Sequence, residues 1–278
     1  MDATREAVPP GAPGRPPAEL ALGARRQILR FARDQQVHLG SSLSVVDLLV
    51  AVLRESGGLA ADRADPDRPR LVLSKGHAVW ALYAVLAEHG LLDPERPGPW
   101  AGHPTDGLPG VDAATGALGH GLSIGAGLAE AARLRGSDRR TYVVLGDGEL
   151  NEGSVWEAVM FAAHRRLDRL VALVDVNGMQ QEGATADLLD LRPLDEKWRA
   201  FGWRVLPVDG HDHPALRAAL SEAAEPTGRP TVLLAHTVKG KGVPFMEHSA
   251  HWHTGTLDQA QFAAALAALG TDGTGNDD

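Results

Sequence analysis

Two oxygen-bearing side chains follow neighbouring predicted strands. The hydrophobic run 141–145 leads into Asp147, and a second run, 170–175, leads into Asn177. Residues 153–168, between the two runs, carry apolar side chains at helical spacing, so the region is expected to form strand, helix, strand. A right-handed crossover makes the two strands parallel, which brings Asp147 and Asn177 to the same edge of the sheet.

This pair of side chains suits a magnesium ion that shares a phosphorylated ligand. Carboxylate and amide oxygens are hard ligands, and Mg²⁺ usually combines a few protein oxygens with phosphate oxygens. Gly146, Gly148 and Gly153 let the backbone approach a diphosphate, and the amino end of the following helix faces its charge. The alternative, a glycine-rich turn in an ordinary doubly wound sheet, leaves the position of Asn177 unexplained.

The remaining elements predict one α/β domain, with a doubly wound, mainly parallel sheet and helices on both faces. We expect the domain over 18–270 and disordered, polar or proline-rich tails over 1–17 and 271–278. The expected helices are 19–33, 45–55 with Ser44 as its N-cap, 77–89, 121–134, 196–201, 214–223 and 258–269. Further strands are expected at 71–73, 204–208 and 231–236, and long loops at 91–118, 178–195 and 237–256.

Composition narrows the class of protein. The chain has 278 residues, a formal net charge of −9 and no cysteine. The acidic balance argues against a nucleic-acid partner, and the absence of cysteine excludes disulfides and thiolate chemistry. No apolar run has the length of a membrane span, and the first 17 residues lack the apolar core of a signal peptide. We therefore expect a cytoplasmic enzyme component with no membrane partner.

Further motifs make the chain resemble the thiamine diphosphate-dependent transketolases. In that family a Gly-Asp-Gly string precedes an Asn by about thirty residues. The other matching strings occur in transketolase order between about Arg26 and Thr256: Ser74-Lys75-Gly76-His77, Gly102-His103-Pro104, Gly116-Ala117-Leu118-Gly119 and Val238-Lys239-Gly240-Lys241-Gly242. Together these strings are highly specific, although each alone is a weak signal.

The resemblance implies thiamine diphosphate and Mg²⁺ as cofactors. The implied metal ligands are Asp147, Asn177 and the carbonyl of Met179. The implied cofactor-binding residues are His77, Gly116, Ala117, Leu118, Asp147, Gly148, Glu152, Asn177 and His253. Glu152 matches a glutamate at a subunit contact near the active site, and a charge in the first turn of a helix explains it equally well.

The same resemblance implies catalytic roles for His38, His103 and His253. Histidine titrates near neutral pH and can move protons on and off sugar hydroxyls. His38 and His103 are expected on the substrate side, and His77 and His253 beside the diphosphate. The other histidines without a motif, His89, His164, His211, His213 and His248, are interpreted as surface or structural. Departures from the family pattern at Val37, Leu39, His120, Val176 and Thr254 lie mostly on the substrate side and leave the sugars open.

The chain most resembles the N-terminal, diphosphate-binding subunit of a split transketolase. Such an enzyme transfers a two-carbon ketol unit from a ketose donor to an aldehyde or aldose acceptor. A separate subunit with the pyrimidine domain would supply the activating carboxylate, so activity is expected only in a complex, as α2β2. The small-residue face of 121–132 and the helix 153–164 are candidates for the buried surface.

Two other functions share part of this pattern. The α subunit of a 2-oxo acid dehydrogenase or decarboxylase shares the Gly-Asp-Gly and Asn pair, but the strings around His77 and Lys239 favour transketolase. A non-catalytic module that kept the fold is the third hypothesis. Intact Asp147, Asn177 and loop histidines argue against it.

Overall fold

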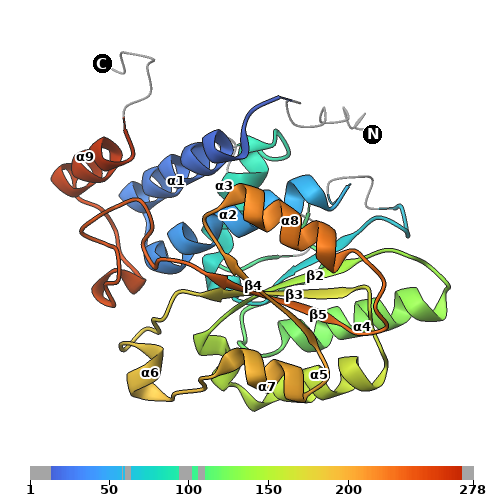
Figure 1. Ribbon diagram of the computed structural model, residues 1–278. Helices are drawn as coiled ribbons and strands as arrows, with labels where there is room; N and C mark the ends of the chain where they lie inside the picture. The colour runs from blue at the N-terminus through green and yellow to red at the C-terminus, as the bar shows by residue number, and fades with distance from the viewer. Residues whose placement is uncertain (1–13, 58, 60–63, 94–101, 106–109, 271–278) are drawn as a thin grey trace.

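The computed structural model describes residues 14–57, 59, 64–93, 102–105 and 110–270. Within these residues one five-stranded sheet has the order β1-β2-β3-β5-β4, and every pairing in it is parallel (Figure 1). The strands are β1 (Arg70–Leu73), β2 (Thr141–Gly146), β3 (Leu170–Val176), β4 (Arg204–Asp209) and β5 (Thr231–His236). The expected parallel α/β fold is confirmed.

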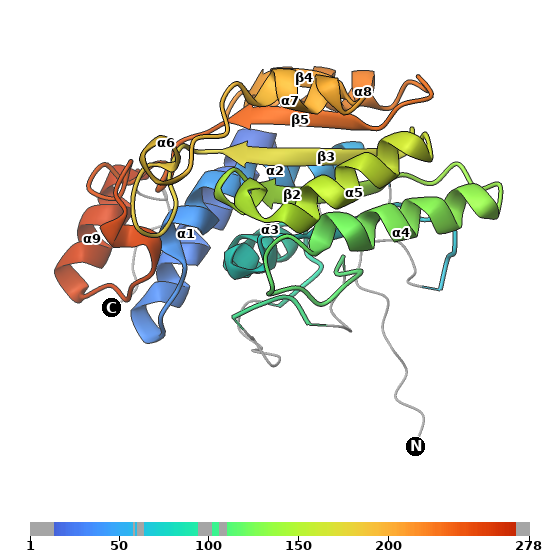
Figure 2. The ribbon, with the colours of Figure 1, turned by 90° about the horizontal axis from the view of Figure 1, so that it is seen from below.

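Helices cover both faces of the sheet (Figures 1 and 2). One layer contains α1 (Pro17–Asp34), α2 (Leu39–Glu55), α3 (Val79–Glu88) and α8 (His213–Ala223), with α9 (Gln259–Ala268) packed beside α1. The opposite layer contains α4 (Gly121–Leu134), α5 (Gly153–His164) and α7 (Leu194–Ala200). Shorter turns are η1 (Gly76–Ala78), η2 (Gly148–Asn151), α6 (Thr185–Leu188) and η3 (His251–His253).

Alternate side chains of the strands feed two separate cores. In β2, Tyr142 and Val144 pack with the α1–α3 layer, whereas Val143 and Leu145 pack with the α4–α5 layer. A strand buried on both faces reads as a continuous apolar run, which is why β2 and β3 could be recognised in the sequence. The parallel order places the carboxyl ends of all strands at one edge, toward which β3 points in Figure 2. The functional loops leave from this edge.

The prediction for the second helix was wrong at its amino end. Helix α2 begins at Leu39, so Ser44 lies inside it and is not its N-cap. The string around Gly40 looks like a turn, but Leu39 and Leu43 are fully buried and draw the segment into the helix. A Cβ on Gly40 would lie 2.9 Å from Lys239 Cε, so glycine allows a loop to pass close to the first turn. Helix α2 therefore carries its amino end to the sheet edge.

Other expected boundaries differ by a few residues. The expected helix 77–89 is a 3₁₀ turn, η1, followed by α3. The expected tails 1–17 and 271–278 lie outside the described residues, except for 14–17. There Pro17 begins α1, and Arg15 forms an ion pair of 2.6 Å with Glu88. No helix in the described part of the chain combines the length and apolar character that crossing a bilayer requires.

Candidate cofactor and active site

Asp147 and Asn177 meet at the carboxyl edge of the sheet, as the sequence predicts. Asp147 follows β2 and Asn177 follows β3, and these strands are direct neighbours. Asp147 Oδ1 accepts a hydrogen bond from Gly148 N at 2.8 Å, and Oδ2 accepts one from Gly178 N at 2.6 Å. Asn177 Oδ1 accepts a bond from Met179 N at 3.1 Å. A carboxylate offers about four acceptor sites and an amide oxygen two, so both groups retain lone pairs for a cation.

A fully buried carboxylate, Asp175, connects Asn177 to side chains from other elements. It accepts hydrogen bonds from Ser44 Oγ at 2.6 Å, from Asn177 Nδ2 at 3.1 Å, and from Thr237 Oγ1, and it forms an ion pair with Lys75. Burial alone would raise the pKa of Asp175, but Lys75 and these hydrogen bonds hold it below its ordinary value. Because the side-chain N–H of Asn177 donates to Asp175, the side-chain oxygen of Asn177 faces away from that anion.

The surroundings of Asp147 disfavour its negative charge. Burial raises the pKa of Asp147 to about 6, with the negative charge of Asp175 as the second cause. The hydrogen bonds from Gly148 and Gly178 lower the pKa but do not offset these effects. A bound divalent cation reverses such a balance because it is the largest local charge. A cation beside Asp147 would therefore stabilise its charged form.

A cavity of about 330 Å³ opens above these residues. All three implied catalytic histidines line it: His38, His103 and His253. The implied cofactor residues that line it are His77, Gly116, Leu118, Asp147, Gly148, Glu152, Asn177 and His253, together with Met179. Ala117 is exposed and is not among the lining residues. The structure thus gathers residues from loops that are far apart in sequence around one hollow.

Three imidazoles form a compact cluster on one wall. The ring centroids of His38, His77 and His253 lie 5.2 to 5.7 Å apart. Burial lowers the pKa of all three, and it brings the pKa of His253 to about 4, with Lys239 as the next cause for that residue. The three rings are therefore neutral at pH 7. Each neutral ring offers one donor and one acceptor nitrogen to a bound molecule.

Lysine and serine side chains support this cluster. Lys239 Nζ donates to the carbonyl of Gln180 at 2.8 Å and lies 3.2 Å from His253 Nδ1. Burial lowers the pKa of Lys239 to about 8, helped by the positive charge of Lys75. His77 Nε2 lies 3.1 Å from Ser41 Oγ, and the carbonyl of Ser41 accepts a bond from Lys75 Nζ at 3.3 Å. The two lysines place positive charge beneath the wall that the histidines form.

His103 reaches the cavity from the loop before α4. It lies opposite a glycine, since a Cβ on Gly116 would lie 3.4 Å from His103 Cδ2. The hydroxyl of Tyr83 donates to the carbonyl of His103 at 3.4 Å. Glu152 is exposed at the rim, at the turn between η2 and α5. Both residues are accessible to a molecule in the cavity.

Sequence reasoning missed several charged residues of the site. Lys75, Lys239 and Asp175 lie inside or beside the recognised strings but are buried, whereas lysine and aspartate are normally surface residues. Glu149 is also buried, and its carboxylate accepts bonds from Ser74 Oγ and from the backbone N–H of two glycines, Gly119 and Gly146. The motif strings were the available signal, because they contain Lys75 and Lys239 beside their histidines.

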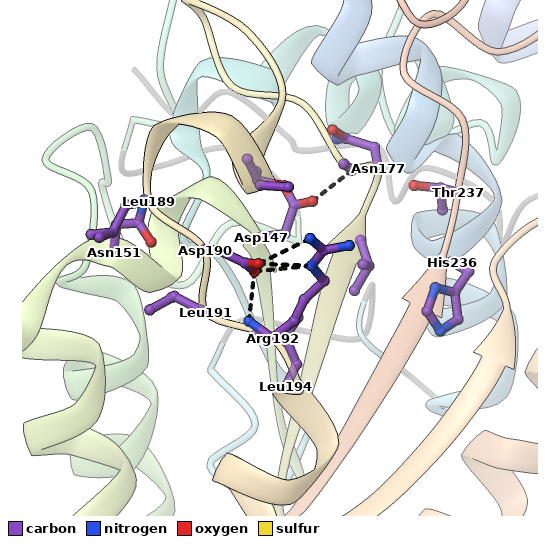
Figure 3. A pocket seen from close by; sticks show the side chains of 14 residues that line it. Asp147, Asn151, Asn177, Leu189, Asp190, Leu191, Arg192, Leu194, His236 and Thr237 are labelled. Carbon is purple, nitrogen blue, oxygen red and sulfur yellow. Dashed lines mark hydrogen bonds and ion pairs between the residues drawn. The ribbon is translucent and has the colours of Figure 1, made fainter.

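A second hollow, of about 370 Å³, lies on the other side of Asp147 and Asn177. Figure 3 shows Arg192 bound to Asp190 within it, with His236 on the opposite wall. The imidazole cluster does not line this hollow. The cavity of about 330 Å³ is lined by the imidazole cluster as well as by Asp147 and Asn177, so it is the candidate site.

The donor set fits Mg²⁺ that shares a phosphorylated ligand. Among the described residues, no three His, Asp or Glu side chains gather closely enough to hold a metal ion alone. Asp147, Asn177 and the carbonyl of Met179 would supply oxygen ligands only, and a diphosphate would complete the shell. Gly148 allows the close packing of this turn, because a Cβ there would lie 2.7 Å from Gln180 Cγ.

Comparison with known families agrees with this geometry. The family model described as transketolase, thiamine diphosphate binding domain, matches residues 28–276. The chain belongs to the transketolase family. It therefore carries a thiamine diphosphate-binding domain.

Relatives of similar length are named as transketolase subunits. The chain is 41% identical over 245 residues to the 6-deoxy-6-sulfo-D-fructose transketolase subunit SqwG of Clostridium sp. (strain MSTE9), covering 85% of this chain and 89% of the relative. It is 38% identical over 237 residues to one subunit of the apulose-4-phosphate transketolase of Phocaeicola vulgatus, covering 82% and 84%. The resemblance to the N-terminal subunit of split transketolases is confirmed.

Solved transketolases share the fold. The transketolase from Leishmania mexicana superposes with a TM-score of 0.81 at 29% identity over 93% of this chain, and that from Campylobacter jejuni with 0.79 at 29% over 92%. The chain spans 42% of each of these longer proteins. The similarity therefore covers one module of a transketolase.

Proposed function

We propose that this chain is the diphosphate- and magnesium-binding subunit of a two-component transketolase that transfers a two-carbon ketol unit from a ketose to an aldose or another aldehyde. One observation carries the proposal: a single cavity holds Asp147 and Asn177 at one end and the neutral cluster of His38, His77 and His253 on its wall. The family match and the relatives named as sugar transketolase subunits support it.

The metal end binds the cofactor in this proposal. Asp147, Asn177 and the Met179 carbonyl hold Mg²⁺, and Gly148 lets the backbone approach the diphosphate. With the cofactor bound, His77 and His253 would hydrogen-bond to its diphosphate, and the backbone of residues 116–118 would face its aminopyrimidine. When bound, thiamine diphosphate supplies the nucleophilic carbon and the electron sink for carbon–carbon bond cleavage, while the protein supplies orientation and electrostatics.

In this proposal the histidines at the substrate end of the cavity transfer protons. His38 and His103 contact the hydroxyls of the sugar and exchange protons with them, and His253 lies between the two regions. Because burial keeps His38 neutral at pH 7, its free nitrogen can accept a hydroxyl proton without first losing its own. The free-energy cost of removing water from a neutral imidazole when the substrate binds is also small.

The proposal also requires a partner that carries the pyrimidine domain. Among the described residues, the acidic side chains that line the cavity are Asp147, Glu149, Glu152 and Glu182. In this proposal the carboxylate that faces the far ring of the cofactor comes from the pyrimidine-domain subunit. Two copies of each subunit would give an α2β2 assembly.

We infer that the partner covers the outer face of α4 and α5. These helices lie side by side in Figure 2 and pack on each other. Large apolar side chains are exposed on them: Met160 and Phe161 are 51% and 45% accessible, and Leu134 is 70% accessible. Exposed apolar side chains of this size favour burial against another protein surface.

Calorimetric titration with Mg²⁺ and thiamine diphosphate tests the function. We expect weak saturable binding by the isolated chain, tighter binding with the partner subunit, and none with Asp147→Ala. Wild-type chain that binds no thiamine diphosphate with either preparation would contradict the proposal and favour the non-catalytic module. Turnover of a 2-oxo acid instead of a ketose would identify the dehydrogenase alternative.

A further inference from the structure

A buried anion outside the site, Asp47 on α2, collects donors from two other helices and a turn. Arg25 of α1 donates to both carboxylate oxygens, at 3.3 and 2.5 Å. His211 Nδ1 lies 2.7 Å from Asp47 Oδ2, and His213 Nε2 lies 3.1 Å from Oδ1. Burial alone would raise the pKa of Asp47, but Arg25 and the two histidines hold it well below its ordinary range. Asp47 is therefore a fixed anion at neutral pH.

His211 connects this anion to the loop that follows β5. Its Nε2 accepts a hydrogen bond from the backbone N–H of Val238 at 2.9 Å. A ring nitrogen that accepts carries no proton, so the proton of neutral His211 lies on Nδ1 and is donated to Asp47. The series Asp47, His211, Val238 thus fixes one tautomer and joins α2 to the loop.

The glycine before His211 allows this close approach. A Cβ on Gly210 would lie 2.4 Å from Thr237 Cγ2 and 3.0 Å from the carbonyl oxygen of His236. Only a residue without a side chain permits the turn between β4 and α8 to lie against the end of β5. His211 is thereby brought within reach of the Val238 N–H.

Asp47 and Val238, the two ends of this series, each lie in a segment that also carries a residue of the candidate site. Helix α2 has His38 at its amino end and carries Asp47 about two and a half turns farther on. Val238 directly precedes Lys239, whose Nζ contacts the Gln180 carbonyl and His253 Nδ1. A displacement of the Val238 backbone would move Lys239 relative to the imidazole cluster.

We propose that His211, held by Asp47, is a positioning residue that fixes the backbone of Val238 and thereby places Lys239 against His253. The effect on cofactor binding rests on the function proposed above, whereas the effect on the loop does not. His213 provides a matched control: it contacts the same carboxylate, but of the two histidines only His211 accepts the hydrogen bond from the Val238 N–H.

The test compares His211→Ala with His213→Ala in the full chain. Amide hydrogen exchange is measured by mass spectrometry over 237–242, and affinity for thiamine diphosphate with Mg²⁺ by calorimetry. Loss of one hydrogen bond with an unsatisfied amide left behind predicts about tenfold faster exchange and about tenfold weaker cofactor binding in His211→Ala. We expect His213→Ala to change either quantity by less than about twofold, even where it lowers thermal stability.

Equal effects of the two substitutions, or unchanged exchange in His211→Ala, would overturn the proposal. If His211→Ala does not fold, ¹⁵N NMR of the histidine rings in the wild-type chain decides. The expected spectrum has the proton of His211 on Nδ1 at neutral pH, and a proton on Nε2 would refute the proposed contact. Wild-type chain that binds no cofactor would refute the proposed function, while the exchange and NMR results still decide the role of His211.

Discussion

Replacing Asp147 by Asn is expected to stabilise the cofactor-free chain while it removes a ligand of the proposed metal site. In the folded chain the pKa of Asp147 is raised from 3.8 to about 6, mainly by burial. Between about pH 4 and 6 the folded state therefore binds more protons than the unfolded state, so stability falls as pH rises through this window. This upward pKa shift of roughly two units lowers the free energy of unfolding by about 3 kcal/mol once pH exceeds about 6.

Asparagine is neutral at every pH and avoids this penalty. Its amide nitrogen would face one of the backbone N–H groups of Gly148 and Gly178, which costs about 1 kcal/mol. The expected net gain at about pH 7.5, without Mg²⁺ or cofactor, is therefore about 2 kcal/mol. It should disappear below about pH 4, where the wild-type carboxyl is protonated in both states.

Urea denaturation of the wild-type chain and of Asp147→Asn at about pH 7.5 and about pH 4 measures this gain. Asp47→Asn is the control, and its expected change in stability has the opposite sign because Arg25 and two histidines lower the pKa of that carboxyl. Loss of this buried ion pair should destabilise the chain by about 3–5 kcal/mol at neutral pH. Destabilisation of Asp147→Asn at the higher pH, or a gain that persists undiminished at the lower pH, would refute the electrostatic argument.

Three further predictions concern the site and its surface. His103→Ala should lower kcat or raise KM for the sugar by about 10²–10⁴-fold in steady-state assays of the complex, with unchanged cofactor affinity by calorimetry. Unchanged donor kinetics would remove His103 from the site. His77→Ala, by contrast, should weaken cofactor binding. An unaltered dissociation constant for thiamine diphosphate would contradict the place of His77 beside the diphosphate. Phe161→Asp should prevent assembly with the partner in analytical ultracentrifugation while Phe161→Leu retains it; equal assembly by both variants would exclude this face.

The sheet and the positions of Asp147 and Asn177 at its edge were predictable because their signals are local. Strands β2 and β3 are continuous apolar runs, and the residue that follows a parallel strand necessarily lies at the binding edge. Asp147 and Asn177 therefore followed from the strand–helix–strand pattern alone. The four site histidines followed from motif strings, and the structure brings His38, His77 and His253 into one cluster.

The rest depended on tertiary contacts that leave no local signal. Helix α2 starts well before the position that its polar string suggests, since burial of Leu39 and Leu43 overrides the turn propensity of the serines between them. The buried ion pair of Lys75 with Asp175 and the hydrogen bond of Lys239 to the Gln180 carbonyl join segments that are distant in sequence, so no local pattern identifies these partners. His211 and Asp47 are separated by 164 residues, so their contact appears only in the fold.

Donor cleavage by separated and mixed subunits tests the central claim most directly. The purified chain is assayed for ketol transfer at saturating Mg²⁺ and thiamine diphosphate, first alone and then with a second protein that carries the pyrimidine domain. We predict no turnover of any ketose by the chain alone and activity that appears on mixing and is lost with Asp147→Ala. Robust turnover by the isolated chain, with no second subunit detectable by mass spectrometry, would contradict the two-component account.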